Sequence, residues 1–260
     1  MNLGHHSIDV DVFGDHKVLD TYRRLAVLLD TLASPPADER GILARLFAEL
    51  EVISNSSIFG GPTQHPFSEK LEARLGWSEK EPKALSEQDK VAIAETLDEV
   101  RLRCIGAAIL SKKSGTSDPQ KVFAEVSAVV DQVGGAEKSP IVYGPGHVAH
   151  AQIGETFVVL LPGMQDPRTL STVIDHLHQL FEQRGSGKNW VVDFSAVRQM
   201  PLLLVANVLT YRQKLREDGS DLFVCWVRAD SFRDIFKERM TKAFSLKEMG
   251  GFYHSTADPD

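Results

Sequence analysis

Two short segments in the C-terminal half of the chain contain almost only apolar residues: WVVDF at 190–194 and DLFVCWV at 221–227. A strand with one face in water alternates polar and apolar residues, so continuous runs of this kind are typical of strands covered on both faces. Helical patterns lie before, between and after them, at 167–181, at 201–216 and from 231 onward. This alternation predicts right-handed crossover connections and a mostly parallel sheet covered by helices.

Three more strands are predicted upstream, where turn residues separate short β-branched and apolar runs. We expect them near 141–143, 147–152 and 156–161. Such additional strands at the start of the sheet would make it mixed. The segment AFSLKEM at 243–249 is expected to close this part of the chain as a short strand and a helix.

The first half of the chain differs, because its apolar residues recur every three or four positions. This spacing predicts helices at 16–32, 38–53, 67–75, 86–110 and 118–133. Ser86 and Asp89 are spaced as in a capping box, and Asp118 followed by Pro119 is typical of a helix start. The inward face of the second helix is predicted to consist of Ile42, Leu43, Leu46, Phe47, Leu50 and Ile53.

These patterns predict a two-domain α+β protein. An all-α bundle of four or five helices is expected at 1–135, and a linker with the first strands at 136–152. An α/β domain with a mixed, mostly parallel sheet is expected at 153–260.

Composition narrows the classes of partner. The chain has 260 residues, of which 42% are hydrophobic and 25% charged, and its net charge is −7. A negative net charge argues against nucleic-acid binding and against docking on anionic lipid, since both rely on dense lysine and arginine. Cys104 and Cys225 lie in apolar segments, which indicates free thiols and a reducing compartment. No run reaches the roughly 18 apolar residues of a membrane span, and no secretory signal is expected, so we predict a cytoplasmic protein.

Motifs for catalysis or cofactor binding do not emerge. GSGK at 185–188 lacks the glycine spacing and the leading strand of a phosphate-binding loop. His176 and His178 lie two apart on a predicted helix, where such residues do not face each other. His147 and His150 could bind a metal only with ligands from elsewhere. We therefore expect no catalytic residue, no cofactor, no metal site and no enzymatic activity.

Residues 153–252 carry an ordered series of segments: FVVLLPG, an amphipathic helix, WVVDFSAV, a helix ending in YRQKLREDGS, DLFVCWV and ADSFRDIFKERMTKAFSL. In this order and pattern the chain resembles the STAS domain, the fold of bacterial anti-sigma factor antagonists and stressosome proteins. The signature of that family reads Asp-x-Ser-x-Val, three variable residues, then Asp-Ser-x-Gly. Asp193, Ser195 and Val197 match the first half of the signature.

The second half of the signature departs from the family. Pro201 stands in place of the aspartate, Leu202 in place of the phosphorylated serine and Leu204 in place of the glycine. A phosphate at a helix start gains from the helix dipole and the free amides, and it adds about −1.5 to −2 of charge that can eject a partner. Leu202 has no hydroxyl, so this position cannot be phosphorylated.

The resemblance and its departure predict a non-enzymatic regulatory or scaffold protein that binds protein partners through a degenerate STAS domain. The resemblance implies partners such as an anti-sigma-factor-like kinase or other STAS proteins. The candidate partner-binding residues are Asp193, Ser195, Met200, Pro201, Leu202 and Leu203.

Two interpretations stay open for several of these residues. Asp193 either orients the following loop for function or accepts hydrogen bonds from the amides of the turn. Ser195 either accepts phosphate or bonds to nearby backbone. Met200, Leu202 and Leu203 form either an exposed apolar patch or a surface covered by the helical bundle.

Two other functions are open at this point. Stressosome relatives carry a helical, globin-like domain before the STAS domain, so the same order here suggests a ligand-sensing signalling protein. An enzyme with its site in the helical domain is the other alternative, and His65 is the first residue to examine in it. The unpaired first strands also predict a homo-oligomer or pairing with a partner chain.

Overall fold

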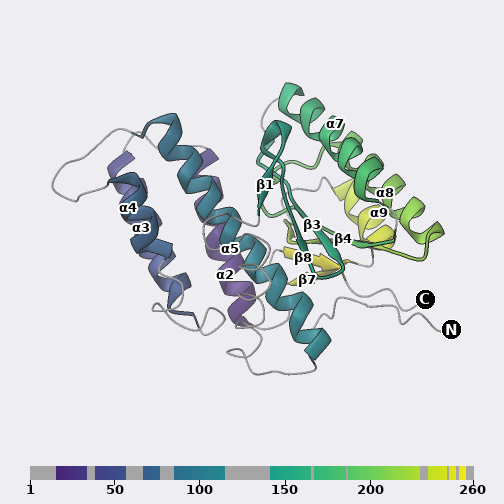
Figure 1. Ribbon diagram of the computed structural model, residues 1–260, viewed down its shortest axis with the longest axis horizontal. Coiled ribbons are helices and arrows are strands. Elements are labelled where there is room, and N and C mark those ends of the chain that lie inside the picture. Colours follow the sequence, from purple (N-terminus) through teal and green to yellow (C-terminus); the bar gives the residue numbers. More distant parts are fainter. Residues whose placement is uncertain are drawn as a thin grey trace. The chain divides into compact units, whose positions relative to one another are not determined.

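A computed structural model describes residues 16–33, 39–56, 67–76, 85–114, 141–164, 167–185, 187–228, 234–244, 246–249 and 252–255. The chain divides into two compact units, Asp15–Ala128 and Met1–Gly14 together with Val129–Asp260. Helices predominate in the first unit and all strands of the described residues lie in the second (Figure 1). The α+β class is therefore confirmed. The domain limits 1–135, 136–152 and 153–260 stay predictions.

Four helices are described in the first unit. They are α2 (His16–Ala33), α3 (Glu39–Ser54), α4 (Phe67–Leu75) and α5 (Glu87–Ser114). All four agree with the predicted helices to within a few residues, and all six residues predicted for the inward face of α3 are buried. The predicted helix at 118–133 lies outside the described residues. None of the described helices is both long enough and apolar enough to cross a membrane.

The start of α5 is the predicted capping box. The Ser86 amide donates to Asp89 Oδ2 at 2.9 Å, and the Asp89 amide donates to Ser86 Oγ at 3.2 Å. The Ser86 hydroxyl also donates to Asp89 Oδ2 at 2.6 Å. These bonds satisfy amide groups that the first turn of a helix otherwise leaves without partners, and so they define where α5 begins.

The second unit contains a five-stranded mixed sheet. Its elements are β1 (Val142–Tyr143), the 3-10 turn η2 (Pro145–His147), β2 (Ala149–Ile153), β3 (Thr156–Leu160), α7 (Pro167–Arg184), β4 (Asn189–Asp193), α8 (Leu202–Glu217) and β5 (Leu222–Cys225). The strand order is β1-β2-β3-β4-β5. The pairings β1–β2 and β2–β3 are antiparallel, whereas β3–β4 and β4–β5 are parallel.

The prediction of a mixed sheet is thus confirmed, but a mostly parallel sheet is not, because two of the four pairings are antiparallel. The physical reason is connection length. Only a tight turn at Gly154 and Glu155 joins β2 to β3, and parallel neighbours require a crossover of a dozen or more residues. The helices α7 and α8 provide such crossovers for β3, β4 and β5, and they lie side by side on one side of the sheet (Figure 1).

A second, antiparallel sheet was not predicted. It consists of β6 (Val227–Arg228), β8 (Phe252–Ser255) and β7 (Leu246–Met249) in that order, with α9 (Asp234–Phe244) between β6 and β7. The strand predicted over 221–227 is present as β5 but is shorter than expected, because Trp226 adopts a left-handed conformation with φ of 56° and ends it, and Val227 belongs to β6. The strand expected within 243–249 is present as β7, but the helix expected in the same segment is not: its first two residues end α9 and its last four form β7, which pairs with the unpredicted strand β8.

The core of the second unit lies between the first sheet and the helices. Alternate residues of the three parallel strands, among them Phe157, Val159, Trp190, Val192, Leu222 and Val224, pack with α7 and α8. The intervening residues, such as Val158, Val191 and Phe223, are also buried. The prediction that β4 and β5 are covered on both faces is therefore confirmed.

Arg212 on α8 connects three elements of this unit. Its Nε donates to Asp221 Oδ1 at 2.8 Å, just before β5, and its Nη1 donates to the Ala243 carbonyl near the end of α9. Arg216 donates to the same carboxylate at 3.1 Å. Burial raises the pKa of Asp221, but the hydrogen bonds from the two arginines outweigh burial and hold this pKa below its ordinary value. The carboxylate thus stays charged and fixes the C-terminal half of α8.

The capping box leads to a stability prediction. Replacing Ser86 with Ala removes the acceptor of the Asp89 amide, so we expect Ser86→Ala to lower the free energy of unfolding by about 1 kcal/mol. Urea denaturation followed by far-ultraviolet circular dichroism measures this change. Gln88→Ala, at an exposed position in the same turn, is the control and should stay within about 0.5 kcal/mol of the parent. Equal effects of the two substitutions would contradict the assignment.

Candidate functional site

The loop between β4 and α8 lies at the carboxyl end of the parallel strands. Backbone pairing continues past the strand ends: the Leu161 amide donates to the Asp193 carbonyl at 3.1 Å, and the Phe194 amide donates to the Cys225 carbonyl at 3.0 Å. The segments that follow β3, β4 and β5 are therefore held at one edge of the sheet. In sheets with parallel strands this edge is where ligands and partners commonly bind.

Asp193 fixes the start of this loop from inside. Its side chain and that of Ser195 are both fully buried, with 0% exposure. Asp193 Oδ1 accepts the Ser195 amide at 2.8 Å, and Oδ2 accepts the Ser195 hydroxyl at 3.0 Å. The structure therefore supports the second interpretation of Asp193, in which its carboxylate accepts hydrogen bonds from the turn. Ser195 donates its hydroxyl inward and does not offer it to solvent.

The other end of the loop is apolar. Pro201 precedes α8 in an extended conformation, with φ of −71° and ψ of 134°, and provides no side-chain cap. Leu202 and Leu203 follow in the first turn, and each is 58% exposed. Leu204 is fully buried in the core and Met200 packs partly against it. The first turn of α8 therefore directs one leucine inward and two outward.

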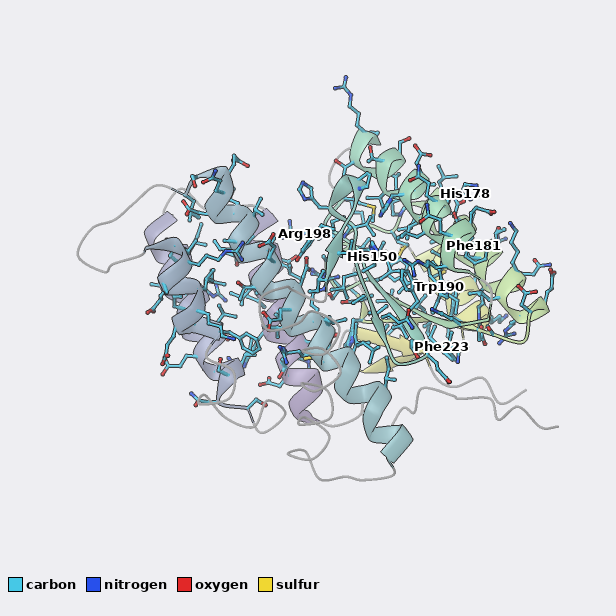
Figure 2. All side chains as sticks on the ribbon, viewed as in Figure 1. His150, His178, Phe181, Trp190, Arg198 and Phe223 are labelled. Atoms are coloured by element: carbon cyan, nitrogen blue, oxygen red, sulfur yellow. The ribbon has the colours of Figure 1, made fainter. Side chains whose placement is uncertain are left out.

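The six predicted partner-binding residues thus divide into two groups. Asp193 and Ser195 are buried and shape the loop, whereas Leu202 and Leu203 form an exposed pair. Met200 and Pro201 are half-buried between them. We refer to Leu202 and Leu203 as the leucine pair. Half-buried Arg198 lies in the same loop (Figure 2) and is the cation nearest in sequence to this pair.

A second cluster, which the sequence did not reveal, lies between β2 and α7. The ring centroids of His150 and His176 are 6.0 Å apart. His176 is only 9% exposed, and neither of its ring nitrogens has a hydrogen-bond partner among the described residues; the same holds for His150 Nδ1. His178 is exposed, which confirms that it does not face His176.

The environment of His150 disfavours positive charge. Burial lowers the pKa of His150, and the nearby His176 and Arg184 lower it further. On its other side His150 contacts Phe157, with ring centroids 5.5 Å apart. The aromatic series continues through Trp190 and Phe181 (Figure 2). The pair therefore lies at the end of an apolar aromatic layer.

No metal centre is formed by the part of the chain that the structure describes, because no group of three or more histidine, cysteine, aspartate or glutamate side chains could hold an ion there. His65, the residue proposed for an enzymatic alternative, lies outside the described residues. Cys104 and Cys225 are buried thiols.

Among the surface pockets of the part of the chain that the structure describes, two are open depressions. One, in the helical unit, is lined in part by Arg74, Glu87 and Asp89, and the other in part by Arg212 and Arg216. Their charged groups already serve the fold: Arg74 pairs with Glu95, Asp89 belongs to the capping box, and both other arginines hold Asp221. Neither hollow therefore provides a better candidate site than the loop before α8.

Comparison with protein-family models, curated proteins and solved structures found no match. The resemblance to STAS domains therefore rests on the segment order and on Asp193, Ser195 and Val197.

The Asp193 geometry leads to a prediction about the loop. Asp193→Ala leaves the Ser195 amide and hydroxyl buried without their acceptor, so we expect the free energy of unfolding to fall by about 3 kcal/mol. Ser195→Ala removes only the hydroxyl bond and is expected to cost about 1 kcal/mol. Chemical denaturation of both variants measures the difference. A smaller loss for Asp193→Ala than for Ser195→Ala would show that the carboxylate does not hold the turn.

Proposed function

We propose that this protein is a non-enzymatic regulatory or scaffold protein that binds a protein partner through the loop between β4 and α8. The observation that carries the proposal is the exposure of the leucine pair. Leu202 and Leu203 are each 58% exposed at the first turn of a helix whose next residue, Leu204, is fully buried. Two adjacent leucines in water at this edge of the sheet are suited to burial against another protein.

The proposed contact is permanent and not switched by phosphate. In the STAS domains that this chain resembles, a serine at the helix start takes up phosphate, but Leu202 has no hydroxyl there. Ser195, the nearest hydroxyl in the matched signature, is fully buried and bonded to Asp193. A kinase would have to unfold the turn before it could reach this oxygen.

The chemistry of the loop indicates the kind of partner. The first turn of α8 contains no acidic residue, and Arg198 is the cation of the loop. A partner surface with an apolar pocket for the leucines would complement the first turn of α8. An anti-sigma-factor-like kinase or another STAS protein remains the partner class that the resemblance suggests, and a cytoplasmic location fits both.

A charge placed in the leucine pair tests the proposal. Leu202→Asp and Leu203→Asp would each bury an unpaired carboxylate in the interface, so we expect at least a tenfold loss of partner recovery. The measurement is affinity purification from an extract of the native host, with quantitative mass spectrometry. Gln213→Asp is the matched control, since it adds the same charge at an exposed position nearly three turns further along α8.

Proteins that bind the parent chain and the Gln213→Asp variant, but neither leucine variant, are the expected partners. Equal recovery with all four proteins would remove this loop from the interface. Stoichiometric phosphate on Ser195 of the purified protein would contradict the absence of a phosphate switch.

A further inference from the structure

We propose that residues 144–148, together with the histidine pair His150 and His176, form a proton-sensitive clasp. In this clasp the turn is held on α7 while the pair is uncharged, and it is released when the pair takes up a proton. The inference is independent of the leucine pair and of the partner-binding proposal.

The turn itself has a strained backbone. His147 has φ of 57° and Gly146 has φ of 67°, so two consecutive residues adopt left-handed conformations. A residue with a Cβ adopts such a conformation at a cost in free energy, which the surrounding structure must offset. Two backbone bonds close the turn: the Gly144 amide donates to the Val148 carbonyl at 3.0 Å, and the His147 amide donates to the Gly144 carbonyl at 3.1 Å.

The surface that holds this turn is α7, and His176 is at its centre. A Cβ added at Gly144 would overlap the imidazole of His176, and one added at Gly146 would meet Val173 at 3.0 Å. The backbone of the turn therefore lies directly against the ring of His176. Neither ring nitrogen of His176 has a hydrogen-bond partner there among the described residues.

The charges that face the pair are also unfavourable to a proton. His176 and Arg184, both basic, are the charged groups that lower the pKa of His150 after burial itself. Lys188 donates to Gln152, the next residue on the same face of β2. Strand β3 contributes the uncharged ring of Phe157.

The remaining titratable side chains of these elements occupy exposed positions, among them Glu155, Arg168 and Glu182. His147 is exposed in the turn, and Asp175 and His178 flank His176 on exposed positions of α7. Protonation of His150 thus adds a charge close to His176 and Arg184, and the hydrogen bond with the Val148 backbone, which favours the proton, does not outweigh burial and these two groups.

The direction of the pH effect follows from this environment. The pKa of His150 is lower in the folded protein than its ordinary value of about 6.5, so the unfolded or opened chain takes up the proton first. The stability that the clasp gains from the uncharged pair is present above about pH 6.5 and is lost as the pH falls from there toward the folded value. A metal ion is a weaker explanation for the pair, since a third protein ligand is absent among the described residues.

Hydrogen exchange of the full chain tests the clasp. We expect the amides of residues 144–150 to exchange at least fivefold faster at pH 5.5 than at pH 7.5, after correction for intrinsic rates and with EDTA present. His150→Phe and His176→Phe keep an aromatic ring but cannot take up a proton, so both should abolish this acid response. His178→Phe, an exposed position on the same helix, is the matched control and should keep it.

Each outcome decides for or against the clasp. Should His176→Phe fail to fold, His150→Phe carries the test, because His150 is only half-buried. Gly144→Ala, which places a methyl group on the His176 ring, should open the turn already at pH 7.5. No acid response in the parent chain, or an undiminished response in His150→Phe, would overturn the proposal.

Discussion

Strands β3, β4 and β5 leave almost no side chain in water, and this constraint organises the whole second unit. A strand with both faces covered has only its ends free, so polar and exposed groups gather in the connecting segments. One face packs on α7 and α8 through Phe157, Trp190 and Val224. The parallel direction then brings the segments after all three strands to one edge. The candidate site is therefore a consequence of burial, since this edge is where loop residues can vary without disturbing the core.

Asp193 shows how the core and the loop are joined. It is the last residue of β4 and fully buried, yet both of its oxygens accept bonds from Ser195. A buried carboxylate is tolerated when such bonds replace water, and here they also turn the chain toward α8. With the loop fixed in this way, Leu204 enters the core and the leucine pair is left outside. The same signature residues that support a phosphate switch in STAS domains thus support, in our proposal, a permanent apolar contact.

The histidine pair lies on the antiparallel side of the same sheet, and its environment is set by packing between β2, α7 and the turn before β2. There, β2 leaves His150 and Gln152 half-buried, and α7 presents a buried His176 to a turn with two left-handed residues. Strain in the turn and unpartnered nitrogens in the rings both depend on the packing around them. In our proposals, the unit combines a partner-binding surface that phosphorylation does not regulate, the leucine pair, with a clasp that opens on protonation.

The sequence by itself determined the elements whose causes lie within a few residues. The helix α3 shows its six predicted inward residues buried, and the Ser86 and Asp89 capping box starts α5, because periodicity and capping act over three or four positions. Continuous apolar runs likewise indicated that β4 and β5 are covered on both faces. Tertiary structure alone decided the rest. Trp226 ends β5 in a left-handed conformation, and a second sheet follows. No local sequence pattern predicts either feature. The exposure of Leu202 and the contact of His150 with His176 depend on which surfaces pack together in the folded chain. The spacing of residues along the sequence does not determine those tertiary contacts.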